Sequence, residues 1–289
     1  MAEDFEDRFF ETADRLRLHF RDYAPREALA DPVLCLHGLT RNARDFEALA
    51  PRIARLGHRV IVPSQRGRGE SDRDATVERY NAGVYAADML RLLDQLQFER
   101  AVFVGTSMGG LMTMIAAASA PERLAGAVIN DIGPEVDPRG LERIRRSTGQ
   151  PRIAADWKEA ASICRTTNGL AFPRETGDTF WDAFARRVFR EAAPGRLELD
   201  YDMAISRAPG AADGPLPDLW PLFDALRPIP TLVVRGEVSD LLAAATVDEM
   251  RRRKPDLETV TVPDVGHAPF LTEPGAWDAL TAFLARQQG

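Results

Sequence analysis

The chain has 289 residues, of which 45% are hydrophobic and 28% are charged, so it can form one large α/β domain or two small ones with a sizeable core. Its formal net charge of −7 argues against nucleic acid as a partner. No secretory signal is recognisable, and no run approaches the roughly 18 apolar residues of a membrane span. We therefore expect a cytoplasmic protein that binds neither nucleic acid nor a membrane. The oligomeric state is not predicted.

Strand and helix patterns alternate in the first part of the chain. A hairpin is predicted from β-type segments at 9–12 and 16–23. Further strands and helices then follow one another, at 32–36, 45–56, 59–62, 85–96, 101–104, 111–119 and 127–130. Such an alternation favours a doubly wound, mainly parallel sheet.

The pattern changes after about residue 133. From 134 to 228 the sequence shows helical patches but no convincing parallel strand. The alternation then resumes with strands at 231–234 and 258–262 and helices at 245–253 and 274–286. We interpret the chain as an α/β core made of residues 1–133 and 229–289, interrupted by a mostly helical insertion at 134–228.

Ser107 stands at the turn between a short apolar strand and a helix of small residues, in the sequence Gly105-Thr106-Ser107-Met108-Gly109. A serine at the apex of such a turn has a strained backbone, and its hydroxyl stands clear of the sheet. The two glycines remove side chains that would collide there. The alternative is a tight glycine turn with an ordinary exposed serine.

A serine hydroxyl becomes a good nucleophile only when a base takes its proton, and a carboxylate must orient that base. His267 is the predicted base. It lies between the last strand and the last helix, where the carboxyl edge of the sheet would bring it to Ser107.

Four segments together resemble the α/β-hydrolase superfamily, in its serine-nucleophile branch with a helical cap: HGLT at 37–40, GTSMGG at 105–110, RGEVSD at 235–240 and DVGHAPF at 264–270. The resemblance implies the α/β-hydrolase fold, with a mainly parallel eight-stranded sheet, helices on both faces and a helical cap at 134–228. The chain departs from the family pattern at 64–72, where relatives commonly have an aspartate first and a histidine between the glycines.

The resemblance also implies roles for further residues. Asp240 matches the family's acid position best, while Asp131 is the alternative acid and Glu237 a third candidate. The backbone N–H groups of Leu39 and Met108 would form an oxyanion hole, and His37 would hold the loop that contains Leu39.

The substrate is less well indicated. Arg41, beside the predicted oxyanion loop, could meet an acidic group, and Trp157 and Trp181 could line an apolar wall in the cap. For each, an ordinary structural role is the alternative. Neither a metal nor a cofactor is expected.

These residues predict a serine hydrolase that cleaves an ester, thioester, lactone or activated carbon–carbon bond of a small, partly apolar metabolite through an acyl-enzyme on Ser107. Two alternatives share the fold. One is a cofactor-free dioxygenase or perhydrolase, in which the histidine and the acid matter more than the serine. The other is a ligand receptor without turnover.

Overall fold

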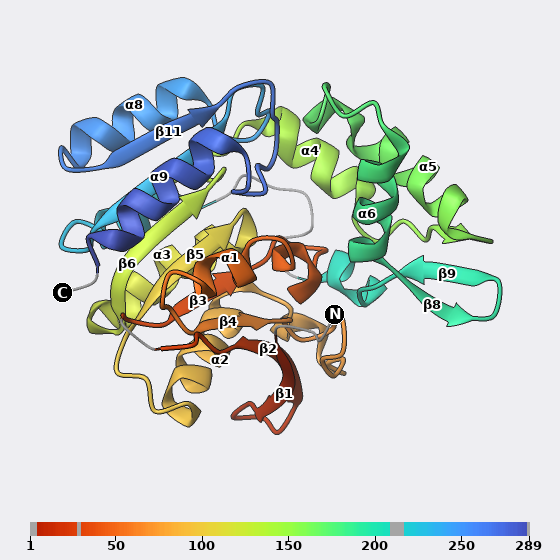
Figure 1. The fold of residues 1–289 in the computed structure, drawn as a ribbon, viewed down its shortest axis with the longest axis horizontal. Coiled ribbons are helices and arrows are strands. Elements are labelled where there is room, and N and C mark those ends of the chain that lie inside the picture. Colours follow the sequence, from red (N-terminus) through yellow and green to blue (C-terminus); the bar gives the residue numbers. More distant parts are fainter. Residues whose placement is uncertain (1–4, 28–29, 209–216, 288–289) are drawn as a thin grey trace.

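The computed structural model describes residues 5–27, 30–208 and 217–287. Its main element is an eight-stranded sheet with the order β1-β2-β4-β3-β5-β6-β10-β11 (Figure 1). The pairs β1–β2 and β2–β4 are antiparallel, and the other neighbouring pairs are parallel. The predicted mainly parallel sheet of eight strands is therefore confirmed. None of the helices in this described part of the chain is long and apolar enough to cross a membrane.

The elements of the structure have the following bounds. The strands of the large sheet are β1 (Glu6–Glu11), β2 (Arg17–Tyr23), β3 (Val33–Leu36), β4 (Val60–Pro63), β5 (Ala101–Thr106), β6 (Leu124–Asn130), β10 (Thr231–Gly236) and β11 (Glu258–Val262). The helices are α1 (Ala50–Ala54), α2 (Ala82–Gln95), α3 (Met108–Ser119), α4 (Pro138–Ser147), α5 (Trp157–Asn168), α6 (Asp178–Val188), α7 (Trp220–Asp224), α8 (Ala244–Arg253) and α9 (Pro274–Ala285).

The central strands are apolar without interruption because both faces of the sheet are covered. In β5, Ala101 and Phe103 belong to one buried core, while Val102 and Val104 belong to a second core on the opposite face. Helices α2, α3 and α8 contribute to the first core, and α1 and α9 contribute to the second. This double coverage explains why the sequence shows continuous apolar runs here and not an alternating pattern.

Helix α3 approaches the sheet more closely than side chains would permit. A Cβ atom at Gly109 would lie 2.1 Å from the carbonyl oxygen of Leu36, and one at Gly105 would lie 2.3 Å from the carbonyl oxygen of Gly109. Ser107, between the two glycines, has φ 54° and ψ −116°. The strained turn and the need for both glycines are therefore confirmed.

Between β6 and β10 the chain leaves the large sheet. Helices α4, α5 and α6 gather at one side of the molecule, on the right in Figure 1, with a three-stranded antiparallel sheet in the order β7-β9-β8. These strands, β7 (Ile153–Ala154), β8 (Phe189–Ala193) and β9 (Arg196–Leu199), were not predicted. The region has its own small hydrophobic core.

The insertion bounded by residues 134 and 228 stays a prediction. Residues 209–216 of this range lie outside the described residues. Near its end, α7 packs against α3, and Phe223 belongs to the core of the large sheet.

Candidate active site

The candidate residues meet at one edge of the sheet because each follows a parallel strand. Ser107 comes directly after β5, and Asp131 comes directly after β6. His267 lies in the loop between β11 and α9. The carboxyl ends of these strands share one edge, which is where open α/β sheets place their ligand sites.

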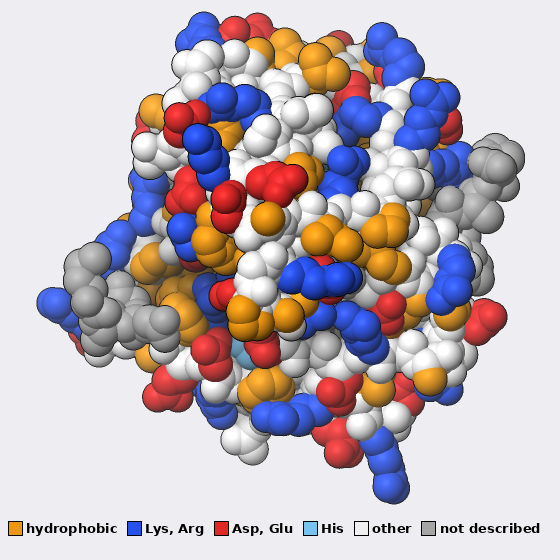
Figure 2. Space-filling model, turned by 90° about the vertical axis from the view of Figure 1, so that its right-hand side faces the viewer, with side chains coloured by type: hydrophobic (Ala, Val, Ile, Leu, Met, Phe, Trp, Pro, Cys, Tyr) orange, Lys and Arg blue, Asp and Glu red, His pale blue; other side chains and the backbone are white. Residues whose placement is uncertain are grey.

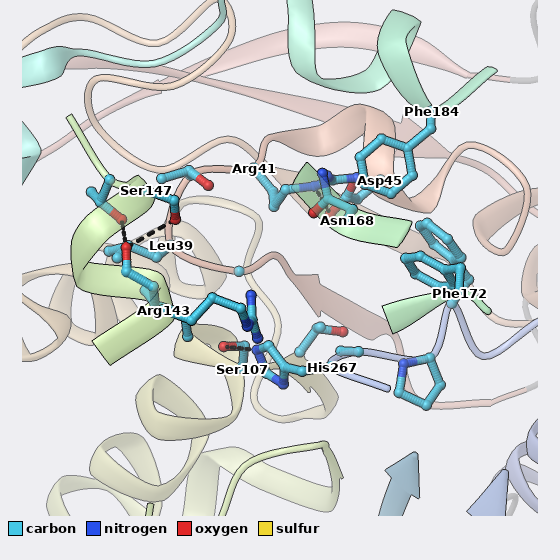
Figure 3. Close-up of a pocket in the computed structure, with 18 of the residues that line it drawn as sticks. Leu39, Arg41, Asp45, Ser107, Arg143, Ser147, Asn168, Phe172, Phe184 and His267 are labelled. Atoms are coloured by element: carbon cyan, nitrogen blue, oxygen red, sulfur yellow. Dashed lines mark hydrogen bonds and ion pairs between the residues drawn. The ribbon is translucent and has the colours of Figure 1, made fainter. Parts of the chain in front are cut away.

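Ser107, His267 and Asp131 form a continuous hydrogen-bonded chain. The Oγ atom of Ser107 is 2.9 Å from Nε2 of His267, and Nδ1 of His267 is 2.8 Å from Oδ2 of Asp131 (Figure 3 shows the first two residues). Because a carboxylate only accepts, Nδ1 carries the imidazole proton and Nε2 is free to accept from the serine hydroxyl. The predicted meeting of Ser107 and His267 is confirmed.

Asp131 is fully buried and holds two further donors. Its Oδ1 accepts a hydrogen bond of 2.8 Å from the N–H of Gly236, and its Oδ2 accepts one of 2.6 Å from the hydroxyl of Ser239. Ser239 also accepts from the backbone N–H groups of Leu241 and Leu242. The loop after β10 therefore offers donors to the buried carboxylate. We did not single out Ser239 from the sequence, where only its place beside Asp240 marked it.

Asp240 does not bind His267, so the prediction of Asp240 as the histidine's acid is wrong. Its two carboxylate oxygens accept hydrogen bonds of 2.6 and 2.8 Å from Arg143 of α4, which hold the pKa of Asp240 below its usual value. Glu237 is also engaged elsewhere, since it accepts from the backbone N–H of Asp264. The alternative acid, Asp131, is the residue that the structure brings to the histidine.

The loop after β3 lies against Ser107 and is held from beneath by His37. Nδ1 of this buried histidine is 2.7 Å from the carbonyl oxygen of Gly38, and its Nε2 accepts a hydrogen bond of 3.0 Å from the N–H of Gln65. Both ring nitrogens are thus occupied in the neutral form. Burial lowers the pKa of His37 from 6.5 to about 4. The predicted holding role of His37 is confirmed.

Arg68 lies between Gly67 and Gly69, where the family resemblance leads us to expect a histidine, and it is completely buried. Its guanidinium donates hydrogen bonds of 3.0 and 2.8 Å to the carbonyl oxygen of Leu39 and lies 3.8 Å from the sulfur of Met108. No described residue accepts a hydrogen bond from the N–H of either Leu39 or Met108. Arg68 therefore contacts both Leu39 and Met108, whose backbone N–H groups donate to no described residue.

A cavity of about 890 Å³, its mouth included, opens over Ser107 and His267. Phe172, Phe184 and Phe270 form apolar parts of its wall. Arg143 also lines it and extends toward Ser107 and His267 in Figure 3. The Ser107 hydroxyl thus lies in a pocket with both aromatic and cationic walls.

A family profile described as the alpha/beta hydrolase fold matches residues 31–274. The chain belongs to the α/β-hydrolase family. It is 34% identical over 249 residues to the 3-hydroxybutyrate-oligomer hydrolase of Cupriavidus necator, and the match covers 84% of each chain. It is 31% identical over 248 residues to the 2-(acetamidomethylene)succinate hydrolase of Mesorhizobium japonicum, again over 84% of each chain.

Solved structures agree with this assignment. An α/β hydrolase from Novosphingobium aromaticivorans matches with a TM-score of 0.92 at 46% identity, over 99% of this chain and 100% of that one. A structure of E-2-(acetamidomethylene)succinate hydrolase matches with a TM-score of 0.79 at 26% identity, over 96% and 97% of the two chains. The α/β-hydrolase fold is thus shown, and the protein is a hydrolase of this family.

The substrate-binding candidates of this hydrolase meet different outcomes. Arg41 lines the cavity, as expected, but it is paired with Asp45 and lies 4.4 Å over the ring of Phe184. Trp157 and Trp181 do not line it, so their prediction as wall residues is wrong. Trp181 is buried in the small hydrophobic core between β6 and β10, and the guanidinium of Arg186 covers Trp157 at 4.6 Å.

Within the described residues, no group of three histidine, cysteine, aspartate or glutamate side chains is arranged to hold a metal ion.

The pKa of His37 predicts a pH-dependent stability. Between about pH 6.5 and pH 4 the unfolded chain takes up a proton on this histidine that the folded chain does not, so the stabilisation is present above pH 6.5 and is lost as the pH falls. We compare wild type with His37→Gln, which cannot titrate. The free energy of unfolding of wild type relative to the variant should fall by roughly 3 kcal/mol across this window in denaturant titrations. A pH-independent difference between the two proteins would contradict the assignment.

Proposed function

We propose that this hydrolase cleaves a carboxylic ester by transferring the acyl group to Ser107. The observation that carries the proposal is the hydrogen-bonded chain from the Ser107 hydroxyl through His267 to Asp131. In this arrangement a base is in contact with the nucleophile, and a buried carboxylate is in contact with the base.

The reaction follows from these contacts. Oγ of Ser107 attacks the ester carbonyl carbon while Nε2 of His267 takes the hydroxyl proton. The imidazolium that forms is stabilised by Asp131 and returns the proton to the departing alcohol as the carbon–oxygen bond breaks. Water, deprotonated by the same histidine, then attacks the acyl-enzyme and releases the carboxylic acid.

The negative charge that develops on the carbonyl oxygen needs donors. The unused N–H groups of Leu39 and Met108 are the candidates, and each such donor typically contributes about 3 kcal/mol to lowering the barrier. The hydrogen bonds from Arg68 to the carbonyl oxygen of Leu39 support this role, because they fix the orientation of that segment.

The choice of an ester is supported by the first relative, which is named for oligomers of 3-hydroxybutyrate, whose units are joined by ester bonds. Thioesters, lactones and activated carbon–carbon bonds lead to the same kind of acyl-enzyme and remain within the proposal. The described part of the predicted cap at 134–228 contributes Arg143, Phe172 and Phe184 to the cavity, which supports its role in shaping a site for a small, partly apolar substrate.

Ser107→Ala tests the proposal directly. Removal of the nucleophile should lower kcat/KM for a short-chain 4-nitrophenyl ester by at least about a thousandfold, because the acyl-enzyme can no longer form. Circular dichroism and thermal melting establish that the variant is folded. Turnover close to that of wild type would favour chemistry that does not use the serine, such as the dioxygenase alternative.

Asp131→Asn and Asp240→Asn form a matched pair that tests which acid serves the histidine. Asp131→Asn should lower kcat by roughly 10⁴-fold, because an amide at this position favours the wrong imidazole tautomer and removes the partner of the imidazolium. Asp240→Asn should lose less than about tenfold, because its carboxylate contacts Arg143 and not the histidine. The reverse ranking in steady-state kinetics would overturn the assignment of Asp131.

A further inference from the structure

A second compartment, which we call the inner chamber, adjoins the cavity over Ser107. It shares Thr40, Arg41, Arg143, Ser147, Asn168 and Phe184 with the first cavity. Its remaining wall includes Arg152 and the apolar side chains of Ile163, Val188 and Phe189. The two cavities therefore share part of their walls, and the inner chamber combines guanidinium groups with apolar surface.

The positive charges of the inner chamber are not fully balanced. Arg41 is paired with Asp45, and Arg143 is paired with Asp240. No hydrogen bond, ion pair or ring contact joins the side chain of Arg152 to any described residue. No aspartate or glutamate is among the described residues that line the chamber. One cation in this compartment thus has no counterion among the described residues.

The local backbone explains why Arg152 faces inward. It precedes the short strand β7, in which Ile153 is exposed and Ala154 is buried in the core of the cap. Side chains alternate along a strand, so Arg152 lies on the same side as Ala154. Pairing of β7 with β9 fixes this direction.

The charge of Arg152 reaches the chamber wall. Burial raises the pKa of the Cys164 thiol to about 12, and the positive charges of Arg41 and Arg152 act against that rise. The outer surface over the cap shows no comparable excess, since basic and acidic side chains are interspersed there (Figure 2). A partly desolvated guanidinium without a counterion is costly unless a ligand supplies the negative charge.

We propose that the inner chamber binds a carboxylate of the substrate and that Arg152 is its anchor. This inference rests on the proposed ester hydrolysis at Ser107 and deepens it, since the substrate class becomes esters that carry a free carboxylate on a short hydrocarbon segment. The ester lies at Ser107, the hydrocarbon segment contacts the apolar wall, and the carboxylate accepts paired hydrogen bonds from the planar guanidinium of Arg152.

The test uses two pairs of esters in which a methyl group replaces the carboxylate. Mono-4-nitrophenyl glutarate and 4-nitrophenyl pentanoate carry the difference on the acyl side, and 4-acetoxybutanoate and butyl acetate carry it on the alcohol side. At least one carboxylated ester should have a kcat/KM about tenfold or more above that of its neutral partner in wild type. In Arg152→Gln the ratio of kcat/KM for the carboxylated ester to kcat/KM for its neutral partner should fall by at least about tenfold.

Arg196→Gln is the matched control. Arg196 is an exposed arginine on β9, in the same small sheet, and it lines neither compartment of the cavity. This variant should keep the wild-type ratio. If wild type hydrolyses the neutral esters as well as both carboxylated esters, the proposed carboxylate site in the inner chamber is overturned. The proposed ester hydrolysis would still stand.

A binding measurement separates the two proposals if none of the esters is turned over. Calorimetry of 4-acetoxybutanoate and glutarate with Ser107→Ala requires no catalysis, and the affinity of at least one of them should fall by about tenfold or more when Arg152→Gln is added. If each anion binds equally well to Ser107→Ala with and without Arg152→Gln, or if neither anion binds, the proposed carboxylate site is overturned. That result would not depend on whether the protein hydrolyses esters.

Discussion

The contact between the first turn of α3 and the end of β3 is the constraint on which the site depends. Only a residue without a side chain fits at Gly109, because the carbonyl oxygen of Leu36 occupies the place of a Cβ atom. This close approach brings the start of the helix, Ser107 and the loop after β3 into one small volume. The strained backbone of Ser107 follows from the same contact, since the chain must turn sharply from strand to helix within that space. The close packing of the large core holds Ser107 in this strained backbone conformation.

Much of the fold and half of the candidate site could be predicted from the sequence, for physical reasons. A strand buried on both faces must be apolar throughout, so the parallel sheet was visible as a series of apolar runs. The glycines around Ser107 mark the close approach, and the place of His267 after the last strand marks the shared edge. The acid could not be predicted this way. Asp131 and Asp240 both follow strands at that edge, and the choice depends on Arg143, a residue of α4 that binds one of them. Local sequence contains no signal for this long-range pairing.

The region between β6 and β10 shows the same limit. Trp181 and Phe184 lie on one helix and belong to one small hydrophobic core, but only Phe184 also lines the cavity. Which side chain reaches the cavity depends on how helices α4, α5 and α6 and the small sheet β7-β9-β8 pack together, and that sheet was not predicted. Nothing in the local sequence marks the roles of Arg68, Arg143 and Arg152. In the structure they hold the loop of Leu39, neutralise Asp240 and line the inner chamber, respectively. Arginine side chains thus contribute much of the charge around the contact between Ser107 and His267.

The central claim is that the Oγ atom of Ser107 is the nucleophile of the reaction. Covalent trapping tests this most directly. Wild type is treated with a serine-reactive phosphonate, its intact mass is recorded, and the modified peptide is mapped. We expect one adduct per chain, located on Ser107, because His267 is in place to take the hydroxyl proton. An adduct on another residue, or no adduct in a preparation that hydrolyses esters, would contradict the account.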